Sequence, residues 1–179
     1  AVIFGMFVSM LIVMMGLDIY VMCQNVNIEN KADTKFAYMY TYKYPTEEVP
    51  DGGEEAFGKT LKKERLGYNL DVTLLGIHDD NPYFDAKVED GKNKIVISTA
   101  VAQKYNVGEG DVFVLNDEET DTKYAFDIVG IAQYSSSLYI FMDIDSMREL
   151  FHEGSDYYNI VFSDKDLSIP SGRLYATTT

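Results

Sequence analysis

Residues 53–60, GEEAFGKT, match the phosphate-loop pattern G-x-x-x-x-G-K-[ST] at every defined position. In nucleotide-binding proteins this loop follows a buried strand and opens a helix, so that backbone N–H groups and the lysine reach the phosphates. Here a polar loop with Pro45 and Pro50 precedes the motif, and Glu54 and Glu55 would place negative charge at the phosphates. We therefore interpret the match as accidental, and expect replacement of its lysine to change only local charge.

Two clusters of acidic residues are candidates for a metal site. The first comprises His78, Asp79, Asp80 and Asp85, and the second is residues 116–121, NDEETD. Neither has the D-x-[DN]-x-[DN]-G spacing of a calcium loop. We expect a solvated turn in the first and a solvent-facing hairpin tip in the second, with no bound metal.

No set of residues predicts catalysis. His152 follows a helix expected at residues 143–151, and the carbonyl end of that helix favours a positive charge. Ser135, Ser136 and Ser137 form a turn that lacks the G-x-S-x-G setting of a nucleophile and an identifiable histidine partner. The sequence predicts a protein without catalytic residues or cofactors.

The first 23 residues, AVIFGMFVSMLIVMMGLDIYVMC, contain one charged side chain, Asp18, and no lysine or arginine. A bilayer-spanning helix needs about 20 mostly apolar residues. A secretory signal would need a basic start, a shorter apolar core and a small-residue cleavage site, none of which is visible. A buried helix of a soluble protein is the alternative, but such helices seldom stay apolar on every side. We predict a transmembrane helix over residues 1–23.

The helical pattern continues past the apolar run as far as the break at residues 32–34, Ala-Asp-Thr. This predicts a stiff stalk over residues 24–31. Asp18 lies near the outer end of the apolar run, and its side chain is expected to reach the lipid headgroups. The alternative is that Asp18 packs against another helix. The chain starts inside the run without a methionine, so we expect a piece of a longer protein. Residues assigned to the membrane helix and to coupling are Phe4, Phe7, Leu11, Met15, Asp18, Tyr20, Asn25, Val26 and Ile28.

Composition limits the remaining possibilities. The chain has 29 acidic and 15 basic residues, a formal net charge of -14, and such a surface repels nucleic-acid phosphates and anionic lipid headgroups. Cys23 is the single cysteine, so no intrachain disulfide can form. The part after the apolar run is long enough for one domain with its own core.

Alternating and apolar patterns predict a succession of strands and two short helices. Residues 57–63 are ambiguous between helix and strand, and residues 45–53 are predicted to be a loop. Gly130 is expected to mark a bulge. Ser98 and Asp143 are expected to cap the two helices. The expected class is α+β, a mixed sheet of hairpins with two short helices, over residues 32–170. Residues 171–179 are expected to be a tail leading to the next membrane segment. The predicted strands are 36–44, 69–77, 95–97, 112–115, 124–131, 138–142 and 156–162.

Three stretches resemble the FtsX-like permeases of ABC transporters that carry a MacB-type extracellular core domain. FGMFVSMLIVMMGLDIY is similar to the first membrane helix of that family. NKIVISTAVAQKYNVGEGDVFVL resembles its strand, helix and "GD" turn, and YAFDIVGIAQYSSSLYIFMDIDSMRELF resembles its "V-x-G-I" strand, following strand and helix. Their order and spacing cover most of residues 4–163, and residues 46–68 match least well.

The resemblance implies a non-catalytic permease portion in a bacterial cell membrane, with the domain after residue 23 outside the cytoplasm. It implies a cytoplasmic ATPase subunit that hydrolyses ATP, a second permease copy, and an extracellular protein, peptide or lipid as substrate. The domain would couple ATP-driven motion to transport or mechanotransmission. The alternatives from the residues are an extracellular sensor anchored by one helix and, less favoured for want of a nucleophile, a tethered hydrolase.

Overall fold

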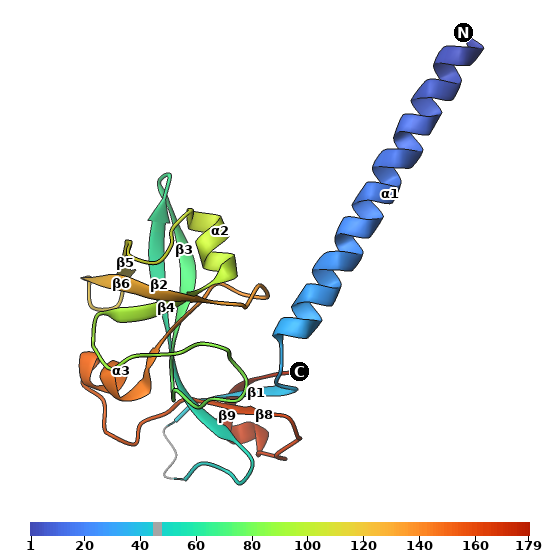
Figure 1. The fold of residues 1–179 in the computed structure, drawn as a ribbon. Helices are drawn as coiled ribbons and strands as arrows, with labels where there is room; N and C mark the ends of the chain where they lie inside the picture. The colour runs from blue at the N-terminus through green and yellow to red at the C-terminus, as the bar shows by residue number, and fades with distance from the viewer. Residues whose placement is uncertain (45–47) are drawn as a thin grey trace.

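The computed structural model describes residues 1–44 and 48–179, and the side chains of residues 27 and 29–32 lie outside the description. A long N-terminal helix is followed by a domain of strands and short helices (Figure 1). The elements are α1 (Val2–Asp33), β1 (Tyr38–Tyr42), β2 (Glu54–Arg65), β3 (Tyr68–Ile77), β4 (Lys94–Ser98), α2 (Thr99–Tyr105), β5 (Val112–Asp117), β6 (Thr122–Ala132), β7 (Tyr139–Asp143), α3 (Ile144–Leu150), β8 (Ile160–Ser163), η1 (Ser171–Arg173) and β9 (Leu174–Thr178).

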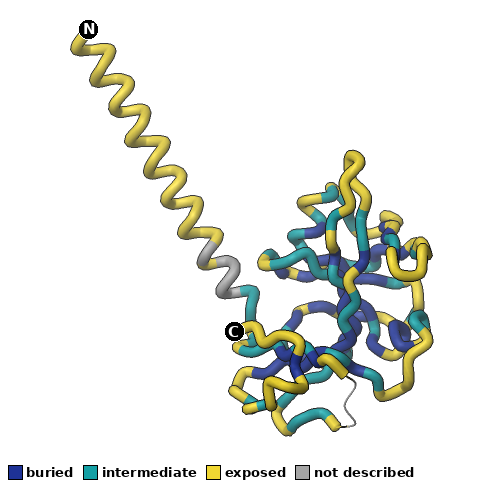
Figure 2. The backbone as a smooth tube through the Cα atoms, turned by 180° about the vertical axis from the view of Figure 1, so that it is seen from behind, coloured by how far each residue is buried: buried dark blue, intermediate teal, exposed yellow. Residues whose placement is uncertain are grey.

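Helix α1 is one continuous element of 32 residues, about 48 Å long. Its apolar part, Val2–Val26, is long and apolar enough to cross a bilayer, and none of it is buried. Figures 1 and 2 show the helix projecting away from the domain, with exposed residues along its apolar part. The helix ends at Asp33, within the predicted break, so an apolar helix that continues into a stalk is confirmed.

Six strands form a closed ring in the order β3-β7-β4-β6-β5-β2, because β2 also pairs with β3. The β2–β3 and β5–β6 hairpins are antiparallel, whereas β3–β7 and β4–β6 are parallel. The mixed α+β class is therefore confirmed. Fully buried apolar side chains fill this ring, among them Leu61, Leu74, Ile97, Phe113 and Ile140. Burial of this kind is the main stabilising term of a domain without disulfides.

Strand β2 belongs to two sheets. Residues 54–56 pair with β8, whereas residues 57–65 pair with β3. Strands β8, β1 and β9 extend the sheet beyond the ring, and a smaller buried cluster that includes Tyr40, Tyr42 and Tyr158 lies against them. The last strand, β9, runs antiparallel to β1, with Thr178 opposite Met39. The C-terminal end of the chain thus lies beside the strand that follows α1 (Figures 1 and 2).

Local sequence signals are confirmed at both short helices. Ser98 Oγ accepts from Val101 N at 3.3 Å, and Asp143 Oδ2 accepts from Ser146 N at 2.9 Å. The register of the β4–β6 pair shifts at Gly130, which agrees with the predicted bulge.

The structure resolves one ambiguous segment, agrees with the predicted loop over the described residues 48–53, and differs from the expectation at the C-terminal end. The ambiguous residues 57–63 are part of strand β2, where Leu61 faces the core. Residues 171–179, expected as a tail, contain η1 and β9. Of the predicted loop 45–53, residues 45–47 lie outside the described residues, and residues 48–53 contain no helix or strand.

Candidate functional site at the helix–domain joint

The carboxylate of Asp33, the last residue of α1, is held by a loop of the domain. Ser135 donates to Asp33 Oδ2 twice, from its backbone N at 3.0 Å and its Oγ at 2.6 Å. Gln133 Nε2 donates to the same carboxylate at 3.3 Å to Oδ2 and 3.5 Å to Oδ1. Hydrogen bonds to an ionised acceptor are stronger than neutral ones. One side chain thus joins the end of the helix to residues 133–135.

The three residues after Asp33 add contacts to other parts of the domain. Thr34 Oγ1 lies 3.2 Å from Ser136 Oγ. Lys35 Nζ forms an ion pair with Asp85 at 2.7 Å, although both side chains are exposed. The ring of Phe36 lies 4.7 Å from that of the buried Phe162, centroid to centroid. We call residues 33–36 with these partners the joint, and the hydrogen bonds of Asp33 to Gln133 and Ser135 the latch. The joint therefore combines the latch with the aromatic packing of Phe36.

The loop that holds Asp33 is itself bound to the start of α2. Thr99 Oγ1 donates to Tyr134 O at 3.0 Å, and Tyr134 N donates back to Thr99 Oγ1 at 3.2 Å. Ala100 N also donates to Tyr134 O, at 3.3 Å. Hydrogen bonds thus run from Asp33 through residues 133–135 to the start of α2.

A pair of stacked tyrosines supports this loop from inside. The rings of Tyr134 and Tyr139 are 5.1 Å apart and almost parallel. Burial raises the pKa of Tyr134 to about 12, and the neighbouring Tyr139 contributes in the same direction. Both phenols thus stay neutral over the physiological range, and the loop carries no switchable charge there.

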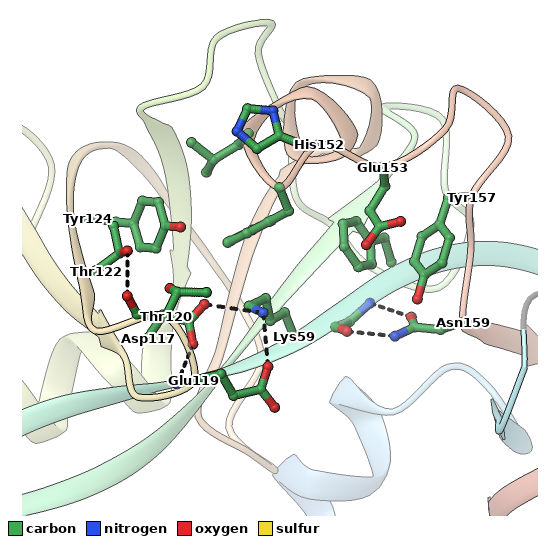
Figure 3. A pocket seen from close by; sticks show the side chains of 14 residues that line it. Lys59, Asp117, Glu119, Thr120, Thr122, Tyr124, His152, Glu153, Tyr157 and Asn159 are labelled. Carbon is green, nitrogen blue, oxygen red and sulfur yellow. Dashed lines mark hydrogen bonds and ion pairs between the residues drawn. The ribbon is translucent and has the colours of Figure 1, made fainter.

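A second feature is a cleft of about 630 Å³ beside β2, shown in Figure 3. It is lined by Phe57, Lys59 and Phe151, by residues of the β5–β6 tip, and by the segment after α3. Asn159 is not free in this cleft, because its amide bonds the backbone N and O of Gly58. The size suits a small ligand, and Lys59 and Asn159 inside it already bind other groups of the protein.

Lys59, the lysine of the GEEAFGKT segment, is the central polar residue of the cleft. Its Nζ lies 3.2 Å from Asp117 Oδ2 and 3.6 Å from Glu119 Oε2. The Asp117 side chain is only 3% exposed, so the expectation of a wholly solvent-facing acidic tip is wrong at this residue. Burial works to raise the pKa of Asp117, but the hydrogen bond from Lys59 and one from the Glu119 backbone leave it below its usual value.

The GEEAFGKT segment does not have the conformation of a phosphate-binding loop. Residues 54–60 lie in strand β2 and not in a loop that opens a helix. Glu55 Oε1 lies 2.7 Å from His78 Nε2 and 3.3 Å from the buried Arg148. The motif's charged residues are therefore part of the packing of the domain. Because Lys59 neutralises a buried carboxylate, the structure leads us to expect that replacing it changes more than local charge.

The remaining candidates for chemistry are dispersed. His152 follows α3 with a φ of 59°, and its backbone N donates to Glu149 O at 3.3 Å. Ser135 contacts Asp33 instead of a histidine. Within residues 1–44 and 48–179, no three histidine, cysteine or acidic side chains are arranged to hold a metal ion.

The residues assigned to coupling from the sequence all lie on α1, and all nine are exposed. The sequence analysis missed Asp33 and its partners in residues 133–137. An aspartate at the end of a predicted stalk, followed by a break, was the available signal. Its partner loop lies about 100 residues further on, and helix periodicity carries no information about such a pairing.

Comparisons with known proteins complete the description. No protein-family model matches the chain, and no curated protein matches it. Two solved structures share 15% and 9% sequence identity, each with a TM-score of 0.47. The first is the extracellular domain of the noncanonic ABC-type transporter YknZ from Gram-positive bacteria, with 72% of this chain and 83% of that chain covered. The second is the periplasmic region of MacB from Actinobacillus actinomycetemcomitans, with 80% and 81% covered. These values do not assign the chain to a family.

Proposed function

We propose that the chain is the first membrane helix and the extracellular domain of an FtsX-like permease subunit of an ABC transporter in a bacterial cell membrane. In this role it couples ATP-driven motion to transport or mechanotransmission. The observation that carries the proposal is the latch at Asp33, where an exposed apolar helix is fastened to the domain by several hydrogen bonds. A flexible tether would need no such fastening.

The exposed surface of α1 supports the membrane part of the proposal. In water, a 25-residue apolar span with no buried residue would be strongly unfavourable, whereas lipid or neighbouring helices would cover it. The cytoplasmic ATPase subunit and a second permease copy are the partners that the role requires. An extracellular protein, peptide or lipid is the class of substrate.

The β1–β9 pairing supports an inserted domain. Because Thr178 lies opposite Met39, a segment continuing from Thr179 would begin next to the end of α1. A domain placed between two membrane segments needs its two ends close together. A single-helix sensor makes no such demand on its last strand.

The test uses the full-length permease with its ATPase partner. Asn25→Pro and Val26→Pro change the last two residues of the apolar span, and a proline inside a helix costs about 3 kcal/mol and kinks it. We expect normal surface levels and complex assembly but impaired transport or resistance. Asn25→Ala and Val26→Ala keep the helix and serve as controls.

A second variant addresses the latch itself. Asp33→Ala removes the acceptor of the bonds from Gln133 and Ser135, and we expect loss of transport with basal ATP hydrolysis retained. Asp51→Ala, at an exposed loop residue, is the matched control. Normal transport with both the proline and the Asp33 variants would overturn the coupling role. Failure of any ATPase subunit to copurify would favour the sensor.

A further inference from the structure

The tip of the β2–β3 hairpin exposes two large apolar side chains. Strands β2 and β3 pair as far as Arg65 and Tyr68, which leaves a two-residue turn of Leu66 and Gly67. Leu66 is 89% exposed and Tyr68 is 74% exposed. A soluble hairpin tip usually carries polar residues, so these side chains suggest an apolar contact outside the domain.

The turn residue itself is unfavourable in its present conformation. Leu66 has a φ of 51° and Gly67 a φ of 81°, the left-handed values of a type I′ turn. Asparagine followed by glycine is preferred in such turns, because a leucine side chain clashes in the left-handed region. Folding alone would favour another residue at this position.

Positive charge gathers at the same tip in a chain whose net charge is -14. The exposed Arg65 donates from its guanidinium to Lys104 O, at the end of α2, and its guanidinium lies 5.7 Å from the Tyr105 ring centre. Lys104 is exposed as well. One acidic residue on the hairpin, Asp71, is paired with Lys62, while Glu64 is exposed. The end of the hairpin, with α2, therefore presents two cations beside two apolar side chains.

The hairpin extends on the same side of the domain as the N-terminal end of α1 (Figures 1 and 2). Val26, where the apolar span ends, is separated from the end of α1 by about 10 Å of helix. The paired part of the hairpin, from Phe57 to Arg65, is about 30 Å long. The tip can therefore approach the plane in which the apolar span ends.

We propose that the hairpin tip, residues 65–68, docks into the interface of an anionic bilayer, the same bilayer that α1 spans. Tyrosine and leucine enter the headgroup boundary, and Arg65 and Lys104 contact lipid phosphates. The inference rests on the membrane span proposed for α1. It assigns the hairpin a second membrane contact that fixes the inclination of the domain.

The chain contains no tryptophan, which gives a direct probe. Leu66→Trp introduces a single tryptophan at the tip, and Ser155→Trp introduces one in the exposed turn after α3. Both full chains are reconstituted in vesicles of phosphatidylglycerol and phosphatidylcholine with or without brominated acyl chains. We expect at least twofold quenching of the Leu66→Trp emission by brominated lipid, with a blue shift, and little change for Ser155→Trp. Equal quenching of the two, or none, would overturn the proposal.

The charge requirement is tested in the Leu66→Trp chain. Arg65→Gln with Lys104→Gln should reduce quenching in phosphatidylglycerol vesicles, whereas Lys87→Gln with Lys165→Gln, the same change of net charge, should not. An equal reduction of quenching by the two double substitutions would contradict lipid recognition by Arg65 and Lys104. Carbonate extraction separates the two proposals: release of the chain contradicts the membrane span, while a retained chain without quenching contradicts only the docking of the tip.

Discussion

Lys59 lies with its ammonium 3.2 Å from the buried carboxylate of Asp117, on the neighbouring strand β5. Removing one partner of a buried pair leaves an uncompensated charge. We expect Lys59→Ala to lower the free energy of unfolding by roughly 3 kcal/mol. Lys62→Ala, on the same strand but paired with the exposed Asp71, should cost much less. Denaturant unfolding of the two variants provides the comparison, and equal losses would contradict the assignment.

The same pair predicts a dependence on acid. The folded-state pKa of Asp117 lies below its usual value of 3.8, so its contribution to stability is complete above that pH. The contribution is lost as the pH falls through the folded-state pKa. In Lys59→Ala the carboxylate loses its main partner, and the acid unfolding midpoint should move to higher pH.

Tyr134 predicts a loss of stability at alkaline pH. Its pKa of about 12 in the folded chain exceeds the usual 10, so the unfolded chain ionises first as the pH rises. The contribution of Tyr134 to stability should be constant below pH 10 and fall between pH 10 and 12. Tyr134→Phe cannot ionise and should fall less steeply, by roughly 1 to 2 kcal/mol at pH 12. Thermal melts across this range test it, with Tyr175→Phe, at an exposed residue, as the control.

Leu66→Asn should stabilise the domain. Asparagine adopts the left-handed conformation of the turn with less strain than leucine, which predicts a gain of roughly 0.5 to 1 kcal/mol. A higher melting temperature would show that leucine is kept at the tip at the expense of stability. Leu66→Ala, which shortens the side chain without favouring a positive φ, is the control. A destabilised asparagine variant would contradict the argument from strain.

The domain should fold without α1, provided that its last strand is present. Residues 32–179 contain the filled ring of strands and the β1–β9 pair. Residues 32–170 lack β9, so Leu174 no longer covers the tyrosine cluster around β1. We expect cooperative thermal unfolding of the longer fragment and a lower melting temperature for the shorter one. A longer fragment without a cooperative transition would show that α1 is needed for folding.

Much of the fold could be predicted because its signals are local. The Ser98 and Asp143 caps, the strand at residues 69–77 and the Gly130 bulge each depend on a few neighbouring residues. Strand β9 could not be found in the same way. Only Leu174 of that strand is buried, so its sequence shows no alternation of buried and exposed positions.

The joint and the cleft depend on residues far apart in the chain. Asp33 and Ser135 are separated by 102 positions, and Lys59 lies on a strand whose ambiguous sequence is resolved only by pairing with β3. Charged residues in a motif can serve either chemistry or packing, and only the neighbours decide which. Here Lys59 serves the packing of Asp117.

The adjacency of Met39 and Thr178 also determines how the domain would respond to tension. A force that separates these two ends would load the β1–β9 hydrogen bonds one after another, as in unzipping, instead of shearing them all together. Each bond contributes only about 1 kcal/mol net. The outermost strand would therefore peel away at low force while the ring of strands stays intact, so the domain would lengthen under tension before its core unfolds.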